Sequence, residues 1–228
     1  MTDGANLTFF DPSKGRVCQG VKLQPMRTKQ VPKTATGSPS HELRIIGGQW
    51  KRSKIKVIDK PGLRPTPDRV RETLFNWLGQ DLTGWRCVDA FAGTGALGFE
   101  AASRGAQSVL MIEQDAQLVL LLGETQKRLS ANTVQIQKGE ALMALQRLAP
   151  QTVDVVFLDP PFDAVFFEKA LQSAAHAVVP EGWVYLEAPV QWTAEALLAC
   201  GLQSVKYLKA GAVHAHLLQP AHPSTSEG

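Results

Sequence analysis

The sequence of 228 residues predicts an α/β domain in which a mostly parallel, seven-stranded sheet carries helices on both faces. From residue 85 onward, short apolar stretches alternate with stretches of helical periodicity. Several of the apolar stretches lack polar alternation, which is typical of parallel strands buried on both faces. A glycine-rich turn also joins the first of these strands directly to a helix, as in doubly wound folds.

The expected elements alternate along residues 81–220, which we interpret as one domain followed by a tail at 221–228. Two final strands lie close enough for a terminal hairpin, which would add an antiparallel strand at the edge of the sheet. Strands are predicted at 87–91, 108–113, 134–137, 153–159, 183–187, 204–208 and 213–218, and helices at 96–104, 116–129, 141–148, 166–177 and 193–200.

The N-terminal part has a different pattern. Residues 1–40 are basic and rich in Gly, Pro, Ser and Thr, with little apolar periodicity, so they are predicted to form a disordered extension. Residues 41–80 are predicted to form a small β-hairpin with a Gly-Gly break, followed by a helix. Thr66 is the predicted N-cap of this helix and Pro67 its first residue. Its predicted buried stripe is Val70, Leu74, Trp77 and Leu78.

Charge is unevenly divided along the chain. The formal charge is +3 overall, but residues 1–71 carry +10 and residues 72–228 carry −7. A basic part attached to an acidic body is typical of proteins that bind a polyanion such as nucleic acid, although a solvated basic tail is an alternative. The three cysteines are widely spaced and no long apolar run or signal peptide is present. We therefore expect no metal site, no membrane span and a cytoplasmic location.

The turn after the first strand of the domain reads Asp89-Ala-Phe-Ala-Gly-Thr-Gly-Ala-Leu-Gly98. Gly93 and Gly95 allow a tight turn and a close approach of the backbone to a ligand. Glu113 ends the next strand, where an acid is expected to bind ribose hydroxyls. The pattern fits NAD as well as S-adenosylmethionine, and a turn without a ligand is also possible. Asp89 favours S-adenosylmethionine, because an acid here repels pyrophosphate and attracts ammonium and sulfonium charges.

Glu140 follows the third strand in the sequence Lys138-Gly-Glu-Ala. In this place it would meet the adenine edge of such a cofactor. The alternative is that Glu140 only interacts with the N-terminus of the next helix.

The fourth strand ends in Asp159-Pro-Pro-Phe162. Neither proline can donate a hydrogen bond, so the strand ladder stops at a rigid turn. The Asp159 carboxylate and the Pro160 carbonyl are then two acceptors that suit both hydrogens of an exocyclic –NH₂ group. Phe162 offers a flat face for stacking a base, which contributes about 1–3 kcal/mol. An ordinary Pro-Pro turn is the alternative.

Together these motifs resemble the amino-methyltransferase branch of the class I S-adenosylmethionine-dependent enzymes. The upstream strings Arg44-Ile-Ile-Gly-Gly-Gln-Trp-Lys-Arg52 and Gly62-Leu-Arg-Pro-Thr-Pro-Asp-Arg-Val-Arg-Glu-Thr-Leu-Phe-Asn-Trp-Leu78 narrow the resemblance to the RsmD family of bacterial 16S ribosomal RNA guanine-N2 methyltransferases. The resemblance covers roughly residues 43–218 and leaves residues 1–40 unexplained. Glu140 departs from the Asp or Asn that is more usual in this family.

The resemblance implies a Rossmann-like class I fold and methylation of N2 of a guanine, of the guanine-966 type, in the RNA of the small ribosomal subunit. We expect a monomer in which the base amine is held by Asp159, Pro160, Pro161 and Phe162. The expected cofactor-binding residues are Asp89, Phe91, Gly93, Gly95, Glu113 and Glu140. The expected RNA-binding residues are Arg44, Lys51, Arg52, Arg64, Thr66, Arg69 and Arg71, with a solvated helix face as the alternative for Arg69 and Arg71.

Three other functions stay open at this point. Adenine-N6 methylation of DNA would use the same corner after the fourth strand, but the short basic part and the lack of a separate target-recognition domain disfavour it. An NAD-dependent oxidoreductase would use the Gly93–Gly98 turn. A non-catalytic RNA-binding protein would keep the basic surface alone.

Overall fold

The computed structural model describes residues 9–11, 16–18, 43–58, 60, 66–160 and 164–221, with the side chains of 9–11, 16–18 and 164–166 left out. The chain divides into two compact units, Met1–Ser38 and Pro39–Gly228. In the first unit, β1 (Phe9–Asp11) and β2 (Arg16–Cys18) form a short antiparallel pair. The rest of the predicted extension, up to residue 40, lies outside the described residues.

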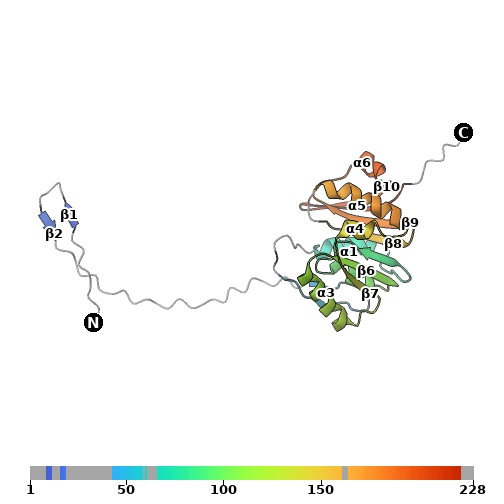
Figure 1. The fold of residues 1–228 in the computed structure, drawn as a ribbon, viewed down its shortest axis with the longest axis horizontal. Coiled ribbons are helices and arrows are strands. Elements are labelled where there is room, and N and C mark those ends of the chain that lie inside the picture. Colours follow the sequence, from blue (N-terminus) through green and yellow to red (C-terminus); the bar gives the residue numbers. More distant parts are fainter. Residues whose placement is uncertain are drawn as a thin grey trace. The chain divides into compact units, whose positions relative to one another are not determined.

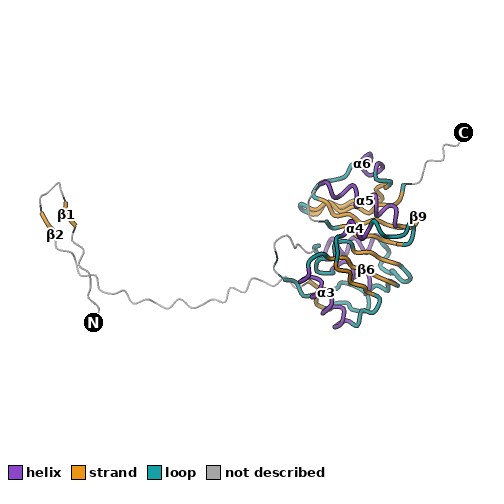
Figure 2. The backbone as a smooth tube through the Cα atoms, in the orientation of Figure 1, coloured by secondary structure: helices purple, strands orange, loops and turns teal. Residues whose placement is uncertain are grey.

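The second unit contains the predicted seven-stranded sheet, shown as a ribbon and as a tube (Figures 1 and 2). Its strands are β5 (Arg86–Asp89), β6 (Ser108–Glu113), β7 (Val134–Lys138), β8 (Val153–Leu158), β9 (Val178–Ala188), β10 (Leu202–Ala210) and β11 (Val213–Pro220). They lie in the order β10-β11-β9-β8-β5-β6-β7. The strands from β7 to β9 are parallel, and β11 is antiparallel to both of its neighbours.

The terminal hairpin β10–β11 is confirmed. The strand that runs opposite to the parallel strands was expected at the edge of the sheet, and this expectation is wrong. The last strand, β11, lies between β9 and β10, and β10 forms the edge. The burial of the two strands explains this order. Residues 215–218 of β11 are all buried, whereas residues 203–207 of β10 are all exposed. The more apolar strand therefore occupies the interior position of the sheet, where both of its faces are covered.

Helices cover both faces of the sheet, as predicted. One hydrophobic cluster joins one face of the sheet to α1 (Asp68–Trp77), α2 (Ala96–Ser103) and α3 (Ala116–Leu129). A second cluster joins the other face to α4 (Ala141–Leu145), α5 (Ala164–Ala177) and α6 (Ala194–Ala199). Within the described part of the chain, none of the helices is both long and apolar enough to cross a membrane.

Helix α1 begins one residue later than predicted. The N-cap is Pro67, and no side chain caps the helix, so the prediction of Thr66 as N-cap is wrong. The Thr66 hydroxyl instead donates to Oδ2 of Asp159 at 3.4 Å. The buried stripe of α1 consists of Val70, Arg71, Leu74 and Phe75, with Leu78 buried just beyond the helix and Trp77 partly buried against the same cluster.

The predicted N-terminal hairpin is present as the short pair β3 (Leu43–Arg44) and β4 (Lys54–Ile55). The Gly-Gly break between these strands packs against the C-terminal end of α2. A Cβ on Gly48 would lie 1.8 Å from the carbonyl oxygen of Ser103, and Gly48 has a φ of +72°. A Cβ on Gly47 would lie 2.4 Å from the guanidinium of Arg104. Gly48 is therefore required by its close contact with backbone, whereas a side chain at Gly47 would meet only the end of the Arg104 side chain.

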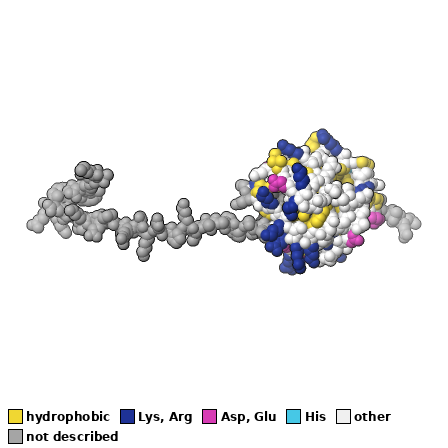
Figure 3. Space-filling view, turned by 90° about the horizontal axis from the view of Figure 1, so that it is seen from below, with side chains coloured by type: hydrophobic (Ala, Val, Ile, Leu, Met, Phe, Trp, Pro, Cys, Tyr) yellow, Lys and Arg dark blue, Asp and Glu magenta, His cyan; other side chains and the backbone are white. Residues whose placement is uncertain are grey.

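Many of the cations in this N-terminal segment face solvent. Lys51, Arg52, Lys54 and Lys56 are all exposed. The face of the molecule drawn in Figure 3 carries groups of Lys and Arg side chains and few Asp or Glu side chains.

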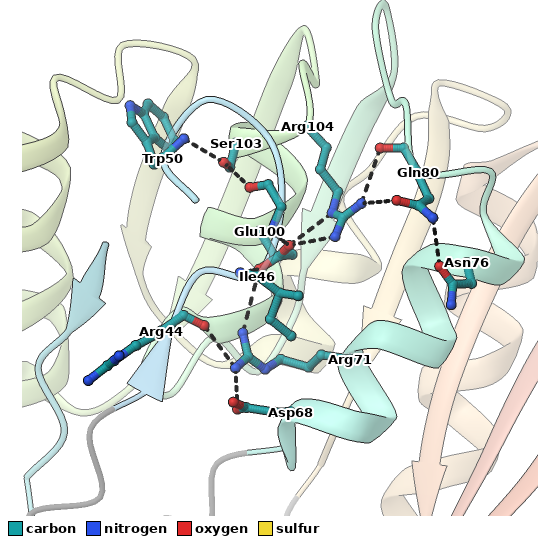
Figure 4. Close-up of polar contacts among 11 residues, drawn as sticks. Arg44, Ile46, Trp50, Asp68, Arg71, Asn76, Gln80, Glu100, Ser103 and Arg104 are labelled. Atoms are coloured by element: carbon teal, nitrogen blue, oxygen red, sulfur yellow. Dashed lines mark hydrogen bonds and ion pairs between the residues drawn. The ribbon is translucent and has the colours of Figure 1, made fainter. Parts of the chain in front are cut away.

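A buried carboxylate, that of Glu100, fastens the N-terminal segment to the sheet domain (Figure 4). Its two oxygens accept hydrogen bonds from the backbone N–H groups of Ile46 and Gly47, each at 2.7 Å. The same carboxylate pairs with Arg104 at 2.8 Å and with Arg71 at 3.5 Å. Arg71 in turn donates to the carbonyl oxygen of Arg44 at 2.9 Å. Glu100 therefore ties α2, α1 and the β3–β4 segment together.

The contact at Gly48 generates a stability prediction. Replacing Gly48 with Ala should lower the free energy of unfolding by about 3 kcal/mol or more, because it adds a clash with backbone to the strain of a positive φ. Gly84→Ala is the matched control, because Gly84 has a φ of +84° but no atom within 4 Å of the added Cβ. It should cost only the strain, about 1–2 kcal/mol. Equal losses in denaturant unfolding would contradict the proposed contact.

Candidate active site

The two sequence motifs lie close together at the carboxyl ends of two central strands of the sheet. β5 and β8 are neighbouring parallel strands in which Asp89 pairs with Phe157, and the Ala90 N–H donates to the carbonyl oxygen of Phe157 at 3.1 Å. The chain leaves β5 for β6 on one side and reaches β8 on the other, so this is the point where the strand order reverses. Crevices at such points bind ligands in open α/β sheets. The glycine turn after β5 and the Asp159-Pro160 corner after β8 therefore lie side by side at this point.

Asp89 is the last residue of β5, a central strand, and is only 2% exposed. Its Oδ2 accepts a hydrogen bond from the backbone N–H of Gly98 at 2.9 Å. Burial is the main cause that raises its pKa to about 7; hydrogen bonds from the Gly98 and Phe91 backbone lower the pKa, and the charge of Glu113 raises it. An ionised Asp89 is therefore costly without a nearby positive charge.

Glu113 holds the glycine turn in place. Its Oε2 accepts from the Gly93 N–H at 2.9 Å, and its Oε1 accepts from the Asp115 N–H at 2.8 Å. Gly95 has a φ of +82°, and a Cβ there would lie 2.6 Å from side-chain atoms of Leu122 and Phe99. Each carboxylate oxygen of Glu113 keeps a second lone pair, so the predicted contact with ribose hydroxyls remains compatible with this geometry.

Asp159 is partly buried at the corner after β8, and Pro160 beside it is buried. Burial, followed by the charges of Glu187 and Asp89, raises the pKa of Asp159 well above its ordinary value. The hydrogen bond from Thr66 acts in the opposite direction. Pro161 and Phe162, which were predicted to complete this corner, lie outside the described residues.

Two residues that the sequence reasoning missed line the same corner. Glu187, 3% exposed, lies at the end of β9, and the hydroxyl of the fully buried Tyr185 donates to its Oε1 at 2.8 Å. Burial raises the pKa of Glu187, against the hydrogen bonds from Tyr185 and Thr66. A signal was present in the sequence, because Glu187 ends an apolar strand as Asp89 and Asp159 do.

The remaining predicted cofactor contacts are placed as follows. Glu140 is the N-cap of α4 and accepts hydrogen bonds from the N–H groups of Leu142 and Met143, each at 2.9 Å. Its alternative role at the helix N-terminus is therefore confirmed, and the adenine contact stays a prediction. Phe91 is partly buried against the second hydrophobic cluster.

The predicted RNA-binding residues do not form one group. Arg44, Lys51, Arg52 and Arg69 are exposed. The prediction for Arg71 is wrong, as is its alternative of a solvated helix face, because Arg71 is fully buried and bonded to Glu100, Asp68 and the Arg44 carbonyl. Thr66, 5% exposed, is at the Asp159 corner instead of the outer surface. Arg64 lies outside the described residues.

The charges of this crevice suit a cation. Asp89, Glu113, Asp159 and Glu187 all lie at the carboxyl ends of neighbouring strands β5, β6, β8 and β9. Such a ring of acids repels a pyrophosphate and stabilises a ligand with positive charge and no phosphate. Among the residues that the structure describes, no cluster of His, Cys, Asp or Glu has the arrangement of a metal site.

Known proteins resemble this chain over most of its length. A family model described as conserved hypothetical protein 95 matches residues 43–219. Ribosomal RNA small subunit methyltransferase D of Escherichia coli is 40% identical over 161 residues, 68% of this chain and 78% of that protein. The protein of the same name from Haemophilus influenzae is 37% identical over 174 residues, 71% of this chain and 90% of that protein. The solved structure of a proposed methyltransferase, yhhF of Escherichia coli, has a TM-score of 0.68 and 33% identity, covering 78% of this chain and 98% of that one.

The burial of Asp89 predicts a pH-dependent cost. Its pKa of about 7 in the folded protein lies above the ordinary value of 3.8, so the folded state binds the proton more tightly and stability falls as pH rises from about 4 to about 7. Asp89→Asn should therefore gain about 2–4 kcal/mol of unfolding free energy at pH 8 and nothing at pH 4. Denaturant unfolding at both pH values measures this.

Asp81→Asn is the control, because Asp81 is exposed and its hydrogen bond from the Thr83 side chain lowers its pKa. This variant should show no gain at pH 8. An Asp89→Asn protein without any gain there would contradict the assigned burial cost.

Proposed function

Because this chain belongs to the RsmD family, which the conserved hypothetical protein 95 model describes, we propose that it transfers a methyl group from S-adenosylmethionine to the exocyclic N2 of a guanine in 16S ribosomal RNA. The family relationship makes it a ribosomal RNA methyltransferase of the class I fold. The observation that carries the proposal is that the glycine turn after β5 and the Asp159-Pro160 corner after β8 lie side by side at the carboxyl ends of two paired parallel strands. A methyl donor and a base amine need to be held this close together.

The acids around the glycine turn support S-adenosylmethionine as the methyl donor. Asp89 is suited to the positive charges of this cofactor, and Glu113 to the hydroxyls of its ribose. When bound, the cofactor supplies an electrophilic methyl group on a sulfonium. NAD, the alternative ligand of the glycine turn, is disfavoured, because its pyrophosphate would lie beside Asp89 among other acidic side chains.

Asp159 and Pro160 would hold and orient the base. The lone pair of a guanine amine is delocalised into the ring, so the nitrogen is a weak nucleophile. Hydrogen bonds from the two amine hydrogens to the Asp159 carboxylate and the Pro160 carbonyl would favour a pyramidal nitrogen and expose this lone pair. Positioning of this kind is a large part of catalysis when the methyl donor is already reactive. We propose direct transfer without a covalent enzyme intermediate.

The exposed cations of the N-terminal segment support RNA as the substrate. Lys51, Arg52 and Arg69 are available for contacts with phosphates, which supply affinity without reading sequence. The base itself must leave its stack to reach the crevice, as is usual for targets in RNA loops. The relatives named for the small ribosomal subunit favour 16S RNA over DNA as the polymer.

Loss of Asp159 tests the function directly. Asp159→Ala should lower methyl transfer to unmodified small ribosomal subunits at least 100-fold, because the amine loses its charged acceptor. Transfer from radiolabelled cofactor gives the rate, and mass spectrometry of the digested RNA identifies the methylated nucleoside. Wild-type activity on duplex DNA and not on ribosomal RNA would overturn the proposal. Asp81→Asn, at an exposed site, should retain the wild-type rate.

Charge reversal on the N-terminal segment tests the RNA surface. Lys51→Glu and Arg69→Glu should each raise the KM for small subunits several-fold, with a smaller salt dependence of RNA binding and unchanged binding of S-adenosylhomocysteine. Lys206→Glu is the matched control, because Lys206 is equally exposed but lies on β10. If all three variants weaken RNA binding equally, the contact surface is wrongly assigned.

A further inference from the structure

A buried acid, Glu187, lies on the strand next to Asp159. Leu158 of β8 pairs with Leu186 of β9, so Asp159 and Glu187 follow paired residues on neighbouring parallel strands. The Thr66 hydroxyl donates to Oδ2 of Asp159 at 3.4 Å and also interacts with the Glu187 carboxylate. Thr66, from the segment before α1, therefore bridges two carboxyl groups that belong to two strands of the sheet.

The surroundings of this pair are acidic or apolar. Asp89 faces it from β5, and Tyr185 donates to Glu187 from within β9. On the other side, β11 places the buried Ala215 opposite Glu187. Among the described residues, no Lys or Arg forms an ion pair with Asp159 or Glu187. Two neighbouring carboxylates in such a place have a raised affinity for protons, because each negative charge opposes ionisation of the other.

The proposed reaction leaves one proton to be removed. When the amine nitrogen forms its bond to the methyl carbon, the nitrogen becomes positively charged and one N–H bond must break. Asp159 is placed to take this proton, but a protonated Asp159 can no longer act as a charged acceptor for the amine.

We propose that Glu187 stores the proton that methylation releases, with the Thr66 hydroxyl as the bridge between the two acids. The N–H bond breaks toward Asp159, and the Thr66 hydroxyl turns its hydrogen from the now protonated Asp159 toward Glu187. Asp159 then passes its proton to the Thr66 oxygen as the original Thr66 proton forms an O–H bond on Glu187. Asp159 returns to its carboxylate form, and no oxidant or other reactant is needed. This inference rests on the proposed function. Glu187 acts through Thr66 and Asp159, so it is a positioning residue.

The pKa directions agree with this role. Burial and the charge of Glu187 raise the pKa of Asp159, and burial raises that of Glu187. As pH falls through these raised values, the pair already holds its proton, so it cannot accept another and the rate should fall. Removing the charge of Glu187 lowers the pKa of Asp159 and should move this loss of rate to lower pH. Removing the Tyr185 hydroxyl raises the pKa of Glu187 and should move the loss to higher pH.

Single-turnover methylation of unmodified small subunits, measured from about pH 5.5 to about pH 9, tests the relay. Glu187→Gln should be about tenfold slower than wild type at neutral pH, with its acidic limb shifted to lower pH. Tyr185→Phe should shift this limb in the opposite direction. Thr66→Val should be as slow as Glu187→Gln, and Thr66→Ser should stay within about threefold of wild type because it keeps the hydroxyl. Glu181→Gln, an exposed position on the same strand β9, should behave as wild type.

Two outcomes would overturn the inference. One is a folded Glu187→Gln protein that binds S-adenosylhomocysteine and keeps both the wild-type rate and the wild-type pH limb. The other is a Thr66→Ser protein as slow as Thr66→Val, which would assign Thr66 to packing. If Glu187→Gln does not fold, the shift in Tyr185→Phe decides, and its absence refutes the relay. A wild-type protein without activity on any RNA would instead refute the proposed function.

Discussion

The site depends on one buried charge, the carboxylate of Glu100. Two guanidinium groups, those of Arg71 and Arg104, are buried with it; Glu100 pairs with both, and Asp68 is a further partner of Arg71. Removing one member of such a group typically costs about 3–5 kcal/mol, because the remaining charges stay buried. The same carboxylate binds the backbone of residues 46 and 47. It therefore sets the position of α1 and the segment before it, which carries Thr66 to the Asp159 corner.

A second constraint is the concentration of acids at the carboxyl ends of the central strands. Asp89, Asp159 and Glu187 are each more easily protonated than free carboxylic acids. An arrangement that only stabilised the fold would place apolar or paired side chains here. Proteins keep such destabilising groups where function requires them, which agrees with the proposed binding of a positively charged methyl donor and the proposed uptake of a proton. These buried acids thus lower the stability of the fold, while they suit the chemistry that we propose at the carboxyl ends of the strands.

Local patterns predicted most of the fold. Helix α3 and strand β6 begin and end at the predicted residues, and the other predicted strands and helices of the domain differ by one to a few residues at their ends, most at the start of β9. The nearness of Asp89 and Asp159 followed from the strand pattern, because both residues lie at the carboxyl ends of parallel strands. What failed depended on partners far away in sequence. From the sequence alone, Arg71 has the pattern of an exposed helix residue, and only its contact with Glu100 explains its burial. Thr66 likewise has the pattern of an N-cap, but its hydroxyl donates to Asp159.

Hairpin geometry allows either of the last two strands to lie inside the sheet, and only the more apolar composition of β11 favours its interior position. Glu187 was missed for a related reason: its importance comes from its neighbour across the β8–β9 ladder and not from a motif. Periodicity reports which face of an element is buried, but not which buried polar groups meet there. These are the positions where the described structure adds most to the sequence.

The insertion of β11 between β9 and β10 has a consequence for synthesis on the ribosome. β9 ends at Ala188, and the backbone of its residues 184–188 pairs on one side with residues 214–218. Until these residues leave the exit tunnel, the nascent chain carries an unpaired, apolar strand edge next to the Asp159 corner. Such edges are sites of mispairing and aggregation in incomplete chains. The sheet is therefore completed only after β11 has been synthesised and has inserted between β9 and β10.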